Sequence, residues 1–383
     1  MAPSFACLRA SWRDRAATIV VETVMATIGI LLIVAPIAAS QSWLDRHFLP
    51  SFFVPRHWYV VIERVVRGAI ATAGVALVLG RSRLAYVVMR APLTAAQVVV
   101  AAACAIVSSE FALRWIHLQP TEWLAREEEP RRQDDPQLGW VLVPARAGRS
   151  TVSGQTVEYA IDAPGYRVRR VDESTDTERP TMLFVGESVM FGEGLAWDDS
   201  IPAQVSAMLG IQSANLAVHG YSTDQIYLRL ARELPRFRQP VAVVSIFMTE
   251  LFGRNLDEDR PHLGPGLVWQ RAKQESRLVS LAGLLVPYRR DTTVERGLRV
   301  TREVFLAIVE LARRRGATSL VIVPQFGAED QIQRTIRQQI LADDIPSVWV
   351  RLSSDWRLAW DRHPNAQAAR VIATAIAARL QGR

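Results

Sequence analysis

Three long apolar segments in the first 116 residues restrict this chain more than any other feature of its sequence. Residues 17–39 contain one charged side chain, that of Glu22, and residues 91–109 contain none before the run continues to Ile116. At 1.5 Å per residue, segments of this length can cross a hydrocarbon core of about 30 Å. We therefore expect transmembrane helices over 17–39 and 91–116.

The segment between them, residues 59–80, carries Glu63, Arg64 and Arg67 in its first half. Glu63 and Arg67 are four residues apart and can pair on a helix, while arginine stems can extend to the headgroup region. We expect a further span here, so that residues 1–120 form a membrane domain of three helices. In an alternative interpretation this segment does not cross. A cleaved signal peptide is disfavoured for the first segment because it is long and further apolar segments follow.

Arginine placement predicts the orientation of these helices. Six arginines flank the cytoplasmic ends of the expected spans, and the loop between the first two spans has two: Arg9, Arg13, Arg15, Arg81, Arg83 and Arg90 against Arg46 and Arg56. An N-terminus inside and three crossings place the rest of the chain outside the cytoplasm. We thus expect a multi-pass protein of the cytoplasmic (inner) membrane with a periplasmic or extracellular C-terminal domain. If residues 59–80 do not cross, that domain is cytosolic.

Charge excludes a nucleic-acid partner and cysteine usage excludes a disulfide framework. The net charge is +7, of which 11 − 5 = +6 lies in residues 1–120 and 34 − 33 = +1 in the remainder. A nucleic-acid-binding domain would carry its basic face in the polar part of the chain. Cys7 and Cys104 form no CxxC motif. We expect no metal site and no cofactor, and membrane lipid as one partner.

The remaining chain divides into a polar segment, residues 121–180, and an alternating one, residues 181–383. The first is rich in charge, proline and glycine, which is typical of a solvated linker with a small lead-in. In the second, apolar runs predict strands at 181–186, 214–218, 241–247, 319–324 and 347–352, and helical patterns lie between and after them at 201–209, 224–234, 295–315, 329–342 and 365–380. This alternation predicts an α/β fold with a doubly wound parallel sheet of about five strands.

Ligands of such sheets bind beyond the carboxyl ends of the strands, where two short motifs stand. Ser188 follows the first expected strand in Gly186-Glu187-Ser188, and His363 follows the last one in Asp361-Arg362-His363-Pro364. A serine near a histidine whose tautomer is fixed by a carboxylate is an arrangement for nucleophilic catalysis. Ser188 could equally be a helix N-cap, and Asp361 an N-cap beside a surface histidine.

These motifs resemble the SGNH (GDSL-like) hydrolase superfamily from about Gly139 to Leu380. Gly186-Glu187-Ser188 is similar to its Gly-Asp-Ser block, and Asn215 to Gly220 to its Asn-x-x-x-x-Gly block. Tyr221-Ser222-Thr223-Asp224-Gln225 is similar to a Tyr-x-Thr-Asp-Gln subfamily, and the last block resembles Asp361-x-His363-Pro364-Asn365. Leu138-Gly139-Trp140 and Gly165-Tyr166-Arg167 are similar to the lead-in of that subfamily. The implied fold is SGNH/flavodoxin-like.

The resemblance implies a role for each matching residue. Ser188 would be the nucleophile, His363 the general base and Asp361 the orienting acid, with the N–H groups of Ser188 and Gly220 facing the oxyanion. The sequence departs from the family where Glu187 replaces its aspartate. It departs again at Thr249, which stands where the family has an oxyanion asparagine. Asn255 could supply that amide if its loop folds back.

We therefore expect a membrane-anchored serine esterase or O-acyltransferase. By resemblance its substrate would be an O-acylated compound outside the cytoplasm, with an acylated glycan as the preferred class over other esters. The alternative is a catalytically inactive SGNH-like domain that serves in binding or assembly, and a protein partner is left open. A transporter is disfavoured because Glu22, Glu63 and Glu110 are scattered along the segments.

Overall fold

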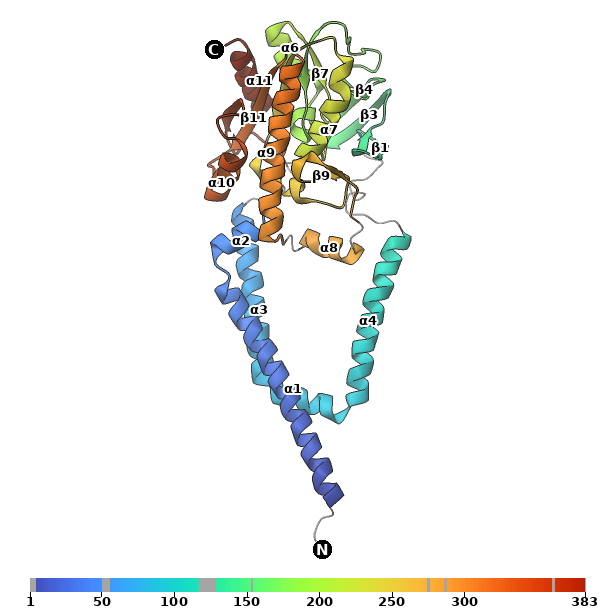
Figure 1. The fold of residues 1–383 in the computed structure, drawn as a ribbon, viewed down its shortest axis with the longest axis vertical. Helices are drawn as coiled ribbons and strands as arrows, with labels where there is room; N and C mark the ends of the chain where they lie inside the picture. Colours follow the sequence, from blue (N-terminus) through green and yellow to red (C-terminus); the bar gives the residue numbers. More distant parts are fainter. Residues whose placement is uncertain are drawn as a thin grey trace. The chain divides into compact units, whose positions relative to one another are not determined.

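The computed structural model describes residues 5–49, 56–116, 129–152, 154–273, 276–285, 288–359 and 362–382 (Figure 1). The chain divides into two compact units. We call residues 1–48, 54–118 and 276–286 the helical unit, and residues 49–53, 119–275 and 287–383 the sheet unit. A short stretch late in the chain thus belongs with the N-terminal helices.

The helical unit consists of helices α1 (Phe5–Ala38), α2 (Gln41–His47), α3 (Arg56–Arg90), α4 (Pro92–Trp115) and α8 (Arg277–Leu285). Two helical stretches of the described chain are long and apolar enough to cross a membrane, Arg15–Ala38 and Pro92–Trp115. The expected span at 59–80 lies inside the single long helix α3, which is not among them. Charged residues near both ends of α3 lower its hydropathy, so the expected three spans are not confirmed.

Helices α1 and α3 approach each other closely at two glycines. A methyl group built on Gly29 would lie 2.6 Å from Cγ2 of Val78, and one built on Gly74 would lie 2.6 Å from the carbonyl oxygen of Gly29. Small residues at a helix crossing allow the two backbones to come this near. Any larger residue at either position would force α1 and α3 apart.

Polar groups near the start of α3 find partners at the end of α1 and in α2. Arg67 donates from Nε and Nη2 to the carbonyl oxygen of Pro36, at 2.9 and 2.6 Å. Gln41 Nε2 donates to Glu63 Oε2 at 2.9 Å. Carbonyl groups in the last turn of a helix lack intrahelical partners, so Arg67 satisfies an acceptor that α1 leaves open.

Helix α8 receives its N-terminal cap from α4. Glu110 accepts hydrogen bonds from Ser276 Oγ at 2.7 Å, from the Arg277 N–H at 3.0 Å and from the Leu278 N–H at 3.0 Å. A carboxylate at this place satisfies N–H groups that the first turn of a helix leaves without acceptors. Glu110 therefore fixes α8 to the end of α4.

The sheet unit is built on an eight-stranded sheet in the order β12-β11-β8-β6-β7-β5-β4-β3. Its parallel strands are β6 (Pro180–Phe184), β7 (Gln212–Asn215), β8 (Gln239–Ile246), β11 (Thr318–Phe326) and β12 (Ser347–Leu352). Counted in chain order, these lie as 2-1-3-4-5, the flavodoxin-like doubly wound arrangement. The α/β fold predicted from the sequence is confirmed, and β6 and β8 flank the switch point.

Helices pack in two groups in the sheet unit (Figure 1). Helix α6 (Ile201–Leu209) packs on α11 (Ala366–Leu380), while α7 (Thr223–Glu233) and α10 (Gln331–Ile340) pack on α9 (Asp291–Arg314). Shorter elements complete the unit: α5 (Ser188–Phe191), the 3₁₀ segments η2 (Trp197–Asp199), η3 (Leu234–Arg236), η4 (Thr249–Leu256) and η5 (Pro265–Leu267), and the pair β9 (His262–Leu263) and β10 (Trp269–Gln270).

The segment expected to be a solvated linker contains strands instead. These are β1 (Arg132–Asp135), β2 (Gly139–Leu142), β3 (Arg146–Val152), β4 (Gln155–Ile161) and β5 (Arg167–Val168). β5 joins the main sheet antiparallel to β7, with Arg167 opposite Asn215. Tyr159, Tyr166 and Leu138 are buried in the core. Burial of these side chains stabilises strands that are otherwise charged; residues 121–128 lie outside the described chain.

Candidate active site

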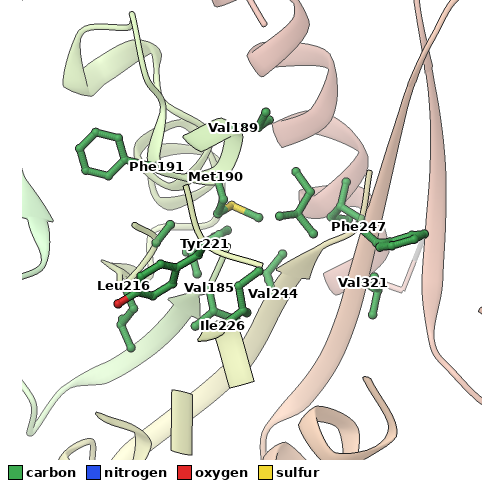
Figure 2. Packing of buried hydrophobic residues seen from close by; sticks show 14 of the residues in the cluster. Val185, Val189, Met190, Phe191, Leu216, Tyr221, Ile226, Val244, Phe247 and Val321 are labelled. Atoms are coloured by element: carbon green, nitrogen blue, oxygen red, sulfur yellow. The ribbon is translucent and has the colours of Figure 1, made fainter. Parts of the chain in front are cut away.

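Ser188 stands on a tight turn at the carboxyl end of β6. A methyl group on Gly186 would lie 2.4 Å from Met190 Cβ and 2.8 Å from Ile246 Cγ2, so the turn requires glycine there. After it, Ser188 begins the four-residue helix α5. Figure 2 shows Val185 and Met190 within the buried cluster beside this turn. The core thus fixes the backbone on which Ser188 stands.

Glu187, rather than Ser188, is the N-cap of α5. Its Oε2 accepts the Val189 N–H at 2.8 Å and the hydroxyl of Ser188 at 2.7 Å. Its Oε1 is buried and makes no hydrogen bond within the described chain. The interpretation of Ser188 as an N-cap is therefore wrong, and the hydroxyl of this serine is held by the carboxylate that precedes it.

Two backbone N–H groups at this edge have no acceptor in the described residues: those of Ser188 and Gly220. Gly220 follows β7 with φ of +82°, a conformation that favours glycine. The two turns are joined, because the Val218 N–H donates to the carbonyl oxygen of Gly186 at 3.1 Å. Two free N–H groups on adjacent turns can bind a negatively charged oxygen.

His363 is buried next to the segment that follows Ser188. Its Nε2 lies 3.7 Å from Oε2 of Glu193, and the Glu193 N–H donates to the carbonyl oxygen of Ser188 at 3.0 Å. His363 is 5% exposed. The sheet therefore brings His363, from the end of the chain, to the turn after β6. Asp361, the expected orienting acid, and its neighbour Trp360 lie outside the described residues.

An ion pair attaches the His363 loop to the start of η4. Arg357 Nη2 donates to Glu250 Oε2 at 3.0 Å, and its Nη1 donates to the carbonyl oxygen of Arg362. Burial lowers the pKa of Arg357, which Glu250 partly offsets. Directly before Glu250, Thr249 is 8% exposed, and its hydroxyl makes no hydrogen bond in the part of the chain described here.

Asn255 uses both ends of its amide inside the fold. Its Oδ1 accepts the Thr223 N–H at 3.1 Å, and its Nδ2 donates to Thr301 Oγ1 at 3.0 Å. These bonds join the first turn of α7 to α9. The amide of Asn255 is thus directed at two helices, while Thr249 keeps an available hydroxyl.

His219, to which the sequence analysis gave no role, lies among cationic groups at the site. Its ring meets that of Phe191 edge-on, with centroids 6.0 Å apart, and its carbonyl oxygen accepts the Trp140 Nε1–H at 3.2 Å. Burial, followed by the charges of Arg132 and Arg254, lowers the pKa of His219 to about 3. The imidazole is therefore neutral at neutral pH.

Arg167 holds the turn that carries Glu193. It is 1% exposed, and it donates from Nη1 to the carbonyl oxygens of Phe191 and Gly192, at 2.6 and 2.7 Å, and from Nη2 to that of Leu195, at 2.6 Å. Burial lowers the pKa of Arg167 to about 10. The sequence marked Arg167 only as part of a lead-in; no local pattern indicates this contact.

Within the described residues, no group of three or more His, Cys, Asp or Glu side chains could hold a metal ion. The groups that the described chain brings together at this site are Ser188, His363, Glu187, Glu193 and the N–H groups of Ser188 and Gly220.

Comparison with known proteins gives structural likenesses of low identity. No protein-family model and no curated protein matches the chain. An acetyl xylan esterase from Butyrivibrio proteoclasticus is similar over 55% of this chain and 66% of its own, at 9% identity and a TM-score of 0.33. A carbohydrate acetylesterase family member from Sinorhizobium meliloti is similar over 53% of this chain and 100% of its own, at 11% identity and a TM-score of 0.31. A member of the lipolytic protein G-D-S-L family from Veillonella parvula is similar over 51% of this chain and 94% of its own, at 14% identity and a TM-score of 0.31.

Proposed function

We propose that this chain is a membrane-anchored serine hydrolase or O-acyltransferase that acts on an O-acylated substrate. One observation carries the proposal. Ser188 stands at the switch point of the sheet, its N–H and that of Gly220 have no acceptor among the described residues, and buried His363 lies beside the same segment. Ligands of doubly wound sheets bind at this place.

In the proposed mechanism, Ser188 Oγ attacks the acyl carbon while His363 takes the hydroxyl proton. The N–H groups of Ser188 and Gly220 stabilise the oxyanion that forms, and the hydroxyl of Thr249 adds a third donor. Collapse of this intermediate breaks the ester C–O bond, and His363 returns the proton to the departing alcohol oxygen. Water or the hydroxyl of an acceptor then attacks the acyl-serine. Asp361, by resemblance, would orient His363.

The Ser188 hydroxyl has to turn before this reaction. It donates to Glu187 Oε2, and rotation about χ1 would redirect it toward His363. Glu187 stays in place during this rotation because the Val189 N–H also holds its Oε2. We infer that the hydrogen bond to Glu187 holds the Ser188 hydroxyl in an unreactive rotamer in the free enzyme, and that this bond breaks when substrate is bound.

We propose that the helical unit spans the cytoplasmic membrane with α1, α3 and α4, and that the sheet unit lies outside the cytoplasm. The hydrogen bonds of Arg67 and Glu63 support the inclusion of α3, because polar groups in a bilayer need partners within the protein. The substrate we propose is an O-acylated glycan, a class that rests on the resemblance of the motifs.

Labelling with a fluorophosphonate tests the nucleophile. We expect the full chain in membranes to form a covalent adduct at Ser188, because the probe requires an activated serine and an oxyanion site. Ser188→Ala should abolish the label. Ser206→Ala is the matched control: Ser206 lies on α6 and its hydroxyl donates to the carbonyl oxygen of Ile211, so this variant should label like the parent. A label that survives Ser188→Ala would contradict the assignment.

Reporter fusions test the topology. A phosphatase fused after Arg383 should be active, and a fluorescent protein that matures only in the cytosol should stay dark at the same place, because three crossings export the C-terminus. The same reporters fused after Arg90 should give the opposite result. An active cytosolic reporter after Arg383 would mean that α3 does not cross.

A second function, binding without catalysis, is favoured by one pair of contacts. The hydroxyl of Ser188 bonds to Glu187, and the Nε2 of His363 lies 3.7 Å from Glu193 Oε2. A domain with these contacts fixed would bind an acylated ligand or a partner protein and leave it intact. Absence of fluorophosphonate labelling in a folded protein would favour this function.

A further inference from the structure

Arg254, on η4, is a cation for which the described chain supplies no partner. Its side chain makes no ion pair or hydrogen bond there, and its Nη1 is buried. Other arginines of the sheet unit have acidic partners, such as Arg260 with Asp224 and Arg357 with Glu250. A buried guanidinium nitrogen without an acceptor is unfavourable unless a ligand supplies one.

The residues around Arg254 belong to the candidate active site. Arg254 lies within electrostatic reach of His219, the residue before Gly220. Arg132 Nη1 would be 3.7 Å from a methyl group on Gly220, and its guanidinium lies over the ring of Trp140 at 5.4 Å. Arg132 thus lies beside the turn that presents the N–H of Gly220, and the charge of Arg254 acts on the residue before it.

The acidic groups of the site are held by other contacts. Glu187 caps α5, and Glu193 lies 3.7 Å from His363 while its charge also acts on buried Arg167. Neither carboxylate pairs with Arg254. The uncharged imidazole of His219 adds no negative charge that could pair with Arg254.

We propose that Arg254 binds an anionic group of the acylated substrate while the ester lies at Ser188. The planar guanidinium fork fits a carboxylate or a phosphate through two parallel hydrogen bonds. A carboxylate would come from a uronic-acid glycan and a phosphate from a phosphorylated glycan. This inference rests on the proposed function, because it places the acyl group at Ser188.

Three acetyl esters test the proposal with the full chain: neutral p-nitrophenyl acetate, an acetylated galacturonate oligomer and an acetylated glycerol phosphate. The parent protein should prefer one anionic ester over the neutral one. Arg254→Gln should lower the ratio of kcat/KM for that ester over the neutral one at least about tenfold, mainly through KM, since the contact is made in the ground state as well. Arg254→Lys should fall between the two.

Arg299→Gln, which removes an exposed arginine on α9, is the matched control and should leave the ratio unchanged. The anionic ester that responds identifies the group as carboxylate or phosphate. A ratio that Arg254→Gln does not change would overturn the proposal, whatever the absolute rates. If no ester reacts, the proposed function fails. Calorimetric binding of unacetylated galacturonate oligomer and of inorganic phosphate then tests the anion site by itself. Binding lost in Arg254→Gln then supports the anion site, and absence of binding overturns it.

Discussion

Replacing His363 with glutamine is expected to lower turnover of an acetyl ester by about 10³ to 10⁴-fold, because in the proposed mechanism Ser188 then loses the base that takes its proton. The Michaelis constant should change little, since the imidazole acts on the proton in transit more than on the bound ester. Initial rates of ester hydrolysis by the detergent-solubilised full chain, measured over a range of ester concentrations, give kcat and KM.

His262→Gln is the matched control for this variant. His262 is also a buried histidine of the sheet unit, with Nδ1 2.9 Å from the carbonyl oxygen of Arg260. It lies outside the proposed catalytic groups, so the variant should retain turnover near that of the parent protein. Equal losses in both variants, with lowered melting temperatures, would indicate a folding defect and contradict the catalytic role of His363.

Arg167→Met is expected to destabilise the sheet unit by about 3–5 kcal/mol. Methionine is apolar and fills much of the space, but it removes the charged donor that the carbonyl groups of Phe191, Gly192 and Leu195 share. Phe191 then keeps the Asn215 amide as a donor, and Gly192 keeps the Leu195 N–H. The turn that carries Glu193 would then lose its fixed position. The shift in the midpoint of denaturant unfolding, with the dependence on denaturant concentration unchanged, gives the change in the free energy of unfolding.

Arg169→Met makes the same chemical change two residues away. Arg169 is exposed and pairs with the exposed Asp198, so its replacement should cost no more than about 1 kcal/mol. A loss of stability for Arg167→Met as small as that for Arg169→Met would show that the three carbonyl groups find other donors. The proposed support of the Glu193 turn would then be wrong.

The parallel part of the sheet unit is predictable from the sequence because its signals are local. Helix α6 has the bounds 201–209 that the pattern predicts, since Pro202 stands in its first turn and Gly210, with φ of +65°, ends it. Strand β7 ends at Asn215, earlier than its apolar run predicts. The apolar residues 216–218 continue past the ladder and are buried beside the turn that carries Ser188.

Strands β1 to β5 were not predictable because their signals are not local. They have two to seven residues each, and three of them, β1, β3 and β5, contain charged residues and no aromatic one. What fixes β5 in the sheet is its pairing with β7, in which Arg167 lies opposite Asn215. No periodicity within so short a strand indicates a partner that far along the chain.

In the candidate site, too, only the features with local sequence signals were predictable. Motif spacing predicted Ser188 and Gly220, and the structure joins the turns on which they stand. Motif spacing did not predict Glu193 beside His363, or the action of the Arg254 charge on His219. These residues approach the site only once distant loops have folded. Chemistry carried by short motifs was visible in the sequence; the charges that surround it were not.

The cap that Glu110 places on α8 limits how this chain can be shortened. A chain that begins after α4 would keep residues 276–285 but lack the carboxylate that accepts the Arg277 and Leu278 N–H groups. Its apolar helix, in which Val279 is already 60% exposed, would then be a site of aggregation in water. A water-soluble form of the sheet unit therefore requires two cuts, one that removes α1 to α4 and one that replaces α8 with a polar loop.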